Sequence, residues 1–166
     1  MDKVAGTENR FWNVQRGVKM FLDTSDLIDG EIYLYLYRTA GENQQKGYVP
    51  AYYFKIVRCE DGIEVGQCDL RIGHNYNTKY GGNIGYEIYE PFRGNHYAAK
   101  ACKLLFELAR KHNMKELIIT CSPENTASRK TCEYAGAKFL GIIDVPEWHE
   151  LYKDGQRKTC QYVVRL

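Results

Sequence analysis

Apolar and polar side chains alternate with a period of two soon after the N-terminal region. In EIYLYLYR (31–38), one face carries Ile32, Leu34 and Leu36, and the other face carries tyrosines. This alternation predicts a β-strand with neighbours above and below it. Similar patterns predict three more strands, at 51–59, 63–73 and 83–90. Turn-rich segments predict the connections between them, at 39–50, 60–62 and 74–82.

The spacing changes to that of a helix after Pro91. Apolar residues recur every three or four positions in Tyr97–His112, which predicts a helix with one buried face. A second helix is predicted over Asn125–Ala135, with Ser122-Pro123-Glu124 as its start and Pro123 at the first position. Apolar runs predict three further strands, at 115–121, 137–144 and 160–166. A polar excursion with Trp148 and His149 separates the last two.

The order of these elements predicts an α/β (α+β) fold in a single domain that covers residues 1–166. A meander of strands followed by β-α-β-α-β favours one mixed, mostly antiparallel central sheet with helices on both faces. Two readings of Arg10–Leu22 stay open, a short helix or a strand near Val18–Leu22. Residues 24–30 are typical of a turn or a cap.

Composition narrows the possible partners. A formal net charge of +2 over 166 residues favours neither nucleic acid nor a membrane surface as a partner. No apolar run is long enough to span a membrane, and the polar N-terminus MDKVAGTENR does not resemble a signal peptide, so we expect a cytoplasmic protein. The six cysteines are scattered without the spacing of a metal site, and buried, reduced thiols explain them.

The turn that leads into the first helix carries the main chemical signal. It contains Arg93, Gly94, Asn95 and His96 directly before the helix. The first N–H groups of a helix lack partners, glycine permits close approach, and arginine adds charge, which together favour a phosphate site. A plain connector of similar composition is the alternative. The spacing matches neither a P-loop nor a dinucleotide-binding fingerprint.

Two blocks of sequence resemble the acetyl-CoA-binding half of the GNAT N-acetyltransferase superfamily. The family turn [RQ]-x-x-G-x-[GA] corresponds to the six residues from Arg93 to Ala98. The family block N-x-x-[SA]-x-x-x-x-E-x-x-G appears in register as Asn125, Ser128, Glu133 and Gly136. The resemblance covers about residues 50 to 145 and is nearest to the ribosomal-protein and small-molecule N-acetyltransferases.

The resemblance implies acetyl-CoA as co-substrate and an amine acceptor. Its diphosphate would lie on the turn, and its pantetheine arm would run along the strand 83–90 like an extra strand. The residues implied in binding are Glu87, Ile88, Tyr89, Arg93, Gly94, Asn95, His96, Tyr97, Ala98, Asn125 and Ser128. The following strand, 115–121, must then splay away to admit the arm. The main chain of strand 83–90 would polarise the thioester carbonyl.

The catalytic groups are less well defined. Glu87 is the first candidate for the general base, followed by Asp69 and His74, although strand carboxylates often pair with neighbours such as Arg71. Cys132 stands where many members carry a tyrosine acid, and it is either that acid or a core cysteine.

Two further departures from the family pattern concern the ligand sites. His96 replaces the central glycine of the turn, and we expect its side chain to point outward and donate to the diphosphate. Only residues 39–50 separate the first two strands, where the family inserts two helices, so the acceptor site is reshaped.

Three functions compete. The first is acetyl-CoA-dependent N-acetyl transfer by direct attack of the amine. The second is a non-catalytic acyl-CoA sensor or interaction module, and the third is a covalent thiol enzyme that uses Cys132. The sequence leaves the acceptor open between a protein amine and a small molecule. A homodimer could form by pairing of the final strand.

Overall fold

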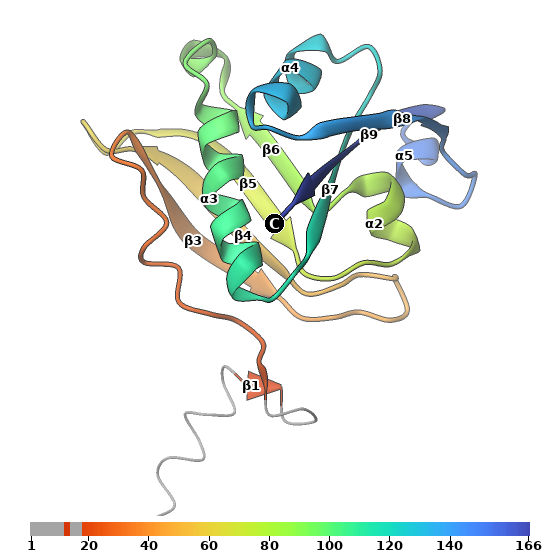
Figure 1. The fold of residues 1–166 in the computed structure, drawn as a ribbon, viewed down its shortest axis with the longest axis horizontal. Coiled ribbons are helices and arrows are strands. Elements are labelled where there is room, and N and C mark those ends of the chain that lie inside the picture. The colour runs from red at the N-terminus through yellow and green to blue at the C-terminus, as the bar shows by residue number, and fades with distance from the viewer. Residues whose placement is uncertain (1–11, 14–17) are drawn as a thin grey trace, which may run out of the picture.

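The structure is a computed structural model that describes residues 12–13 and 18–166 (Figure 1). Near the N-terminus, β1 (Trp12–Asn13) pairs with β2 (Val18–Lys19) in a short antiparallel ladder. The strand reading is therefore correct for residues 18–19, and residues 12–13 also form a strand rather than a helix. The prediction for residues 10–11 and 14–17 lies outside the described part of the chain.

The core of the protein is a mixed sheet of seven strands in the order β3-β4-β5-β6-β7-β9-β8. All neighbours are antiparallel except β6 and β7, which are parallel. The strands are β3 (Ile32–Ala40), β4 (Ala51–Arg58), β5 (Glu64–Arg71), β6 (Ile84–Ile88), β7 (Glu116–Cys121), β8 (Lys138–Asp144) and β9 (Lys158–Arg165). Because β9 is paired on both sides, the expectation that it pairs across a homodimer is wrong, and dimer formation itself stays a prediction.

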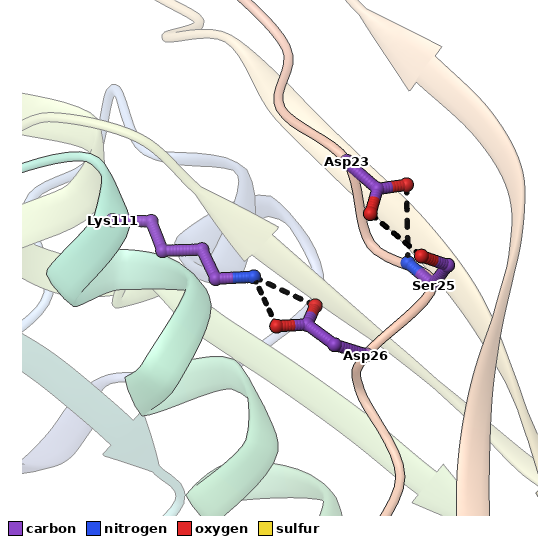
Figure 2. Close-up of polar contacts among 4 residues, drawn as sticks. All are labelled: Asp23, Ser25, Asp26 and Lys111. Carbon is purple, nitrogen blue, oxygen red and sulfur yellow. Dashed lines mark hydrogen bonds and ion pairs between the residues drawn. The ribbon is translucent and has the colours of Figure 1, made fainter.

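One face of the sheet packs against α3 (Tyr97–Lys111), which crosses in front of β3 to β6 in Figure 1. The face of β3 and β4 that carries Ile32, Leu34 and Phe54 is buried beneath it. At the C-terminal end of α3, Lys111 Nζ contacts both carboxylate oxygens of Asp26 at 2.6 Å (Figure 2). This ion pair fastens the segment before β3 to the end of the helix.

That segment is also held by a local turn. Ser25 donates from its N–H and its hydroxyl to the carboxylate of Asp23, at 3.3 Å and 2.6 Å (Figure 2). These hydrogen bonds lower the pKa of Asp23. The turn expected at residues 24–30 is present, with Leu27 buried in the core.

The opposite face of the sheet carries two short helices, α2 (Tyr76–Gly81) and α5 (Glu150–Lys153). His149, the N-cap of α5, contacts the carbonyl oxygen of Asn77 in α2 at 3.2 Å. The predicted mixed, mostly antiparallel sheet with helices on both faces is confirmed. No helix in residues 12–13 and 18–166 is long and apolar enough to cross a membrane.

The parallel strands β6 and β7 diverge after a single pair, Ile84 opposite Ile119. Asn83, which is fully buried, closes the narrow end of this splay. Its N–H donates to Ile118 O at 2.6 Å, and its side-chain oxygen accepts from Ile118 N at 2.9 Å. Its amide NH₂ donates to the carbonyls of Arg71 and Gly73, so one side chain ties β5, β6 and β7 together. The splay expected from the resemblance is therefore present.

The predicted elements agree with the structure apart from three local corrections. The expected loop 74–82 contains α2, whose N-cap Asn75 and residue Thr78 cap each other reciprocally. The expected polar excursion contains α5. The helix α4 (Thr126–Tyr134) begins with Asn125 as its N-cap, so Pro123 is not its first residue, because the Asn125 side chain accepts from Ser128 N instead.

Candidate functional site

The turn before α3 leaves a row of backbone donors exposed. A short 3-10 helix, η1 (Glu90–Phe92), ends β6, and Gly94 and His96 then take positive φ values of 87° and 59°. Among the described residues, the N–H groups of 94 to 98 have no hydrogen-bond partner. A Cβ added at Gly94 would meet nothing within 4 Å. This end of α3 therefore offers several amides and open space to a ligand.

A hollow of about 730 Å³ lies beside this turn, between β6, α3 and α4. We name it the α3 hollow. Of the residues expected to bind the coenzyme, those that line it are Glu87, Ile88, Arg93, Gly94, Asn95, His96, Tyr97, Ala98, Asn125 and Ser128. Sequence blocks about thirty residues apart are thus brought to one cavity. Its open space and free amides suit a phosphorylated ligand such as a coenzyme.

His96 lies in this hollow with its ring turned toward α4. The imidazole stacks on the ring of Tyr134, with centroids 4.0 Å apart and planes 8° apart. Its backbone is left-handed, a conformation in which glycine has no steric cost. The stack keeps the imidazole on the α4 side of the hollow, and the amides of the turn are left uncovered. The coenzyme expected from the sequence is therefore compatible with a histidine at this position.

The backbone of β6 offers a second set of groups at the splay. Two peptide groups of this segment bond to β5, since Asn83 O accepts from Arg71 N and Tyr89 N donates to Val65 O. By alternation, the peptide groups of Tyr86 and Ile88 point toward β7. Beyond Ile84, the peptide groups on this side of β6 have no strand partner in the described part of the chain. Ile88 O accepts from Arg93 Nε at 2.9 Å, which leaves its N–H and the peptide of Tyr86 facing the splay.

Tyr89 does not fit its expected role. Its N–H donates to Val65 O at 2.9 Å, and its hydroxyl donates to Glu64 at 2.5 Å. It does not line the α3 hollow. The prediction that its main chain binds the coenzyme is therefore corrected, because the alternation of the antiparallel ladder turns this amide toward β5.

A second, smaller hollow of about 320 Å³ lies against β5. We name it the β5 hollow, and its lining residues are Tyr37, Arg38, Tyr53, Gln67, Cys68, Asp69, Tyr86 and Glu87. Tyr86 and Glu87 line the α3 hollow as well. The two hollows therefore meet at β6, beside the splay.

Asp69 is a largely buried carboxylate in the β5 hollow. Arg71 Nη2 lies 3.0 Å from its Oδ2, but without hydrogen-bond alignment, and Oδ2 is a buried atom with no hydrogen-bond partner in the described part of the chain. Burial raises the pKa of Asp69 above its ordinary value, and the charges of Arg71 and Arg38 only partly oppose this. Gly85 lies opposite, where a Cβ would come within 2.5 Å of Asp69 Oδ1. A glycine there makes room for the carboxylate.

The other candidate bases lie in different surroundings. Glu87 is exposed, and its Oε2 accepts from Gln67 Nε2 at 3.2 Å. His74 contacts the carbonyl of Glu116 at 3.2 Å and lines neither hollow. The structure thus brings Glu87 and Asp69 together and leaves His74 outside. Among residues 12–13 and 18–166, no cluster of His, Cys, Asp and Glu could hold a metal ion.

Cys132 is fully buried behind Tyr86. Its Sγ lies 3.7 Å from the Tyr86 hydroxyl, which also contacts Ser128 Oγ at 2.6 Å. A hydrogen bond with Cys121, followed by burial, raises the pKa of Cys132. The same hydrogen bond lowers the pKa of Cys121 to about 7. Cys132 lines neither hollow, whereas Tyr86, whose hydroxyl contacts the thiol, lines both.

Sequence reasoning missed Tyr86 and Asn83. The alternation pattern predicts only that Tyr86 lies in a strand, although its position directly before Glu87 is a usable signal once that glutamate is a candidate. Asn83 has no local signal in the sequence, because its hydrogen-bond partners come from residues 71, 73 and 118.

Comparison with known proteins identifies the class. The acetyltransferase (GNAT) domain model matches residues 9–138. The chain therefore belongs to the GNAT acetyltransferase family, whose members use acetyl-CoA for acyl transfer.

An individual relative resembles this chain over only part of its length. The uncharacterized N-acetyltransferase YnaD of Bacillus subtilis is 33% identical over 95 residues, which cover 51% of this chain and 56% of that protein. The chain thus spans little more than half the length of this curated relative.

Solved structures share the fold. The microcin C7 self-immunity acetyltransferase MccE, in complex with acetyl-CoA and AMP, aligns with a TM-score of 0.54 at 22% identity, over 70% of this chain and 61% of that chain. An acetyltransferase from Salmonella typhimurium that modifies the N-terminal serine of a 50S ribosomal subunit protein aligns with a TM-score of 0.54 at 20% identity, over 74% and 67%.

Proposed function

We propose that this protein transfers the acetyl group of acetyl-CoA to a primary amine by direct attack of the amine on the thioester. One observation carries the proposal: the α3 hollow and the β5 hollow share Tyr86 and Glu87. A coenzyme in the first hollow and an amine in the second would therefore meet at β6. Bringing two reactants together in this way is the main contribution expected of such an enzyme.

The α3 hollow would hold the coenzyme. The free N–H groups of residues 94 to 98 and the positive end of the α3 dipole suit the diphosphate. The N–H groups of Tyr86 and Ile88 face the splay, where they can donate to an extended pantetheine arm and to the thioester carbonyl. When bound, acetyl-CoA supplies an activated acyl group, and the protein's own residues supply position and proton transfer.

Asp69 and Glu87 are the candidates for taking the proton of the amine. The raised pKa of Asp69 brings it closer to the working pH, which improves a general base. Its buried Oδ2 also has no hydrogen-bond partner among the described residues, so an ammonium donor would satisfy it. Glu87 lies where the two hollows meet and would orient the amine. We therefore assign Asp69 as base and Glu87 as the orienting carboxylate.

The Tyr86 hydroxyl is the group best suited to return a proton to the coenzyme thiolate. Burial raises its pKa, so it stays protonated at neutral pH. Ser128 Oγ lies 2.6 Å from it and can pass a proton onward. Cys132, which is buried behind Tyr86, would act through that hydroxyl rather than directly.

Thiol release tests the proposal. Purified protein is titrated with acetyl-CoA by calorimetry and then assayed for free thiol with a panel of primary amines. We expect binding, amine-dependent release, and a loss of kcat of about a hundredfold for Asp69→Asn. Glu107→Gln serves as the matched control, because Glu107 is exposed on α3 and, among the described residues, pairs with Arg110 alone. Absence of coenzyme binding at millimolar ligand would end the proposal.

A non-catalytic acyl-CoA sensor is the second candidate. It is favoured by one observation, namely that the position where many family members carry a tyrosine acid holds a fully buried thiol, Cys132. Coenzyme binding without thiol release across the whole amine panel would favour the sensor. Release that is lost in both Asp69→Asn and Glu87→Gln would exclude it.

A further inference from the structure

A third hollow lies on the same face of the sheet as Asp69, farther along β5. It has a volume of about 360 Å³ and is enclosed by α2, α5 and the loop between β3 and β4. We name it the α5 hollow. The lining residues that matter for its chemistry are Tyr48, Tyr53, Arg71, Glu150 and Asp154.

The walls of the α5 hollow are held in place by hydrogen bonds. Asn75 and Asn77 each donate a side-chain N–H to Gly47 O at 2.7 Å, which fixes the β3–β4 loop against α2. Leu151 N donates to His149 Nδ1 at 3.1 Å, so His149 Nε2 carries the proton and donates to Asn77 O. His149 is 5% exposed. The hollow is therefore formed before any ligand arrives.

The α5 hollow adjoins the β5 hollow. Tyr53 lines both, and Arg38 lies 3.8 Å from the centroid of its ring, which holds the ring in position. The ion pair between Asp69 and Arg71 links the two hollows, because Asp69 lines the β5 hollow and Arg71 lines the α5 hollow. Gln67 is paired with Glu87, and Arg71 lies four residues farther on, about 13 Å along an extended strand. One elongated molecule could therefore occupy both the β5 hollow and the α5 hollow.

The charge in the α5 hollow is negative. The guanidinium of Arg71 already has partners within the protein, since its Nη1 donates to the carbonyls of Gly81 and Gly82 and its Nη2 lies beside Asp69. Glu150 accepts a hydrogen bond from the Tyr48 hydroxyl. Neither Glu150 nor Asp154 has a cationic partner within the described residues. Two carboxylates and a tyrosine around a preformed cavity suit an ammonium group, which brings three donors and a positive charge.

We propose that the α5 hollow binds a second, cationic end of the acceptor, so that the preferred acceptor is a diamine or polyamine chain. The reacting amine lies between Asp69 and Glu87, the alkyl chain passes Tyr53, and the distal ammonium contacts Glu150 and Asp154. This proposal rests on the proposed acetyl transfer, because it concerns the acceptor of that reaction. It adds the chemical class of that acceptor.

The test compares acceptors that differ only at the distal end. Octane-diamine and 8-amino-octanol have the same length and the same reacting amine, but only the diamine has a second charge. We expect kcat/KM for the diamine to exceed that for the amino alcohol at least about tenfold, the effect of one charge-assisted contact. Butane-diamine, which is much shorter than the roughly 13 Å between Gln67 and Arg71, should lose most of this preference.

Variants then locate the effect. The double variant Glu150→Gln with Asp154→Asn should bring the ratio of the two kcat/KM values close to one, whereas Glu150→Asp, which keeps the charge, should retain most of the preference. Asp144→Asn is the matched control, because Asp144 lies on β8 outside the three hollows and pairs with Lys158. Equal rates for diamine and amino alcohol in the wild-type protein, or a preference unchanged in the double variant, would overturn the proposal.

Calorimetric titration with octane-diamine separates this proposal from the proposed function. Binding to the wild-type protein that is lost in the double variant, in the absence of any thiol release, would contradict acetyl transfer and still support the cation site. Transfer to monoamines without diamine preference would support acetyl transfer and refute the cation site. Neither binding nor transfer would refute both.

Discussion

The imidazole of His96 lies flat against the phenol ring of Tyr134, 4.0 Å between centroids, and joins the start of α3 to the end of α4. This contact accompanies the left-handed backbone of His96, whose φ is 59°. A left-handed residue other than glycine costs about 1–2 kcal/mol. Stacking of two rings contributes about 0.5–1.5 kcal/mol, so the stack offsets much of that cost.

The stack predicts that substitutions of His96 and of Tyr134 change the stability of the protein by unequal amounts. Tyr134→Ala removes the stack and keeps the strained backbone, so it should lower the free energy of unfolding by about 1 kcal/mol. His96→Gly removes the stack and the strain together, and should be nearly neutral. Urea unfolding of both single variants and the double variant measures the coupling. Tyr134→Phe, which retains the ring, is the control, and a loss as large as that of Tyr134→Ala would contradict the explanation.

Asn83 should be the most sensitive polar residue in the sheet. Asn83→Ala leaves Ile118 N and the carbonyls of Arg71 and Gly73 without their partners in a buried region. We expect a loss of at least about 2 kcal/mol in the free energy of unfolding, because each unsatisfied buried group costs about 1–3 kcal/mol. Asn95→Ala, an exposed position whose side chain makes a single hydrogen bond to Phe92 O, is the comparison. Equal losses in the two variants would be inconsistent with a role for Asn83 at the splay.

Asp69→Asn should stabilise the protein at neutral pH while it lowers activity. Folding raises the pKa of Asp69 above its ordinary value of 3.8, so the folded state holds the proton more tightly than the unfolded state. The stability linked to this proton is fully present below 3.8 and is lost as the pH rises through the folded pKa. Asparagine does not titrate, so the variant does not lose stability in this way as the pH rises. The melting temperature of the variant should exceed that of the wild-type protein at pH 7, and the gap should narrow as the pH falls toward 4.

The hydrogen bond between Cys132 and Cys121 should be visible in a thiolate titration. The Cys121 thiol is expected to ionise near pH 7, since its hydrogen bond with Cys132 lowers its pKa to about 7. Cys132→Ala removes the donor and should raise that pKa, whereas Cys132→Ser keeps a donor and should not. Ultraviolet absorbance of the thiolate against pH measures the shift. An unchanged titration in Cys132→Ala would contradict the pairing.

Much of the fold follows from local patterns in the sequence. The alternation in β3 and the helical spacing in α3 depend on neighbours two to four residues apart, so their bounds were predicted to within a few residues. The helices α2 and α5 were missed because they have six and four residues and lie in polar segments. The capping pair Asn75 and Thr78 was the only signal of α2.

The candidate site was predictable where a motif carried it and unpredictable where tertiary contacts create it. The block Arg93 to Ala98 and the block from Asn125 lie in one hollow, as the resemblance implied. The role of Tyr89 was wrong because the direction of an amide depends on the register of β5 and β6, which the sequence does not specify. The α5 hollow needed residues from four separate segments, and no local pattern predicts that.

The divergence of β6 and β7 has a consequence for the cohesion of the whole molecule. The sheet consists of two leaves, β3 to β6 and β7 to β9, that are joined in the middle by a single rung, Ile84 with Ile119. An extended ligand laid between the leaves would add the missing rungs. Backbone amides of Tyr86 and Ile88 should then exchange rapidly with deuterium in the free protein and slowly when the extended ligand is bound. Hydrogen exchange at these two amides would therefore report ligand binding.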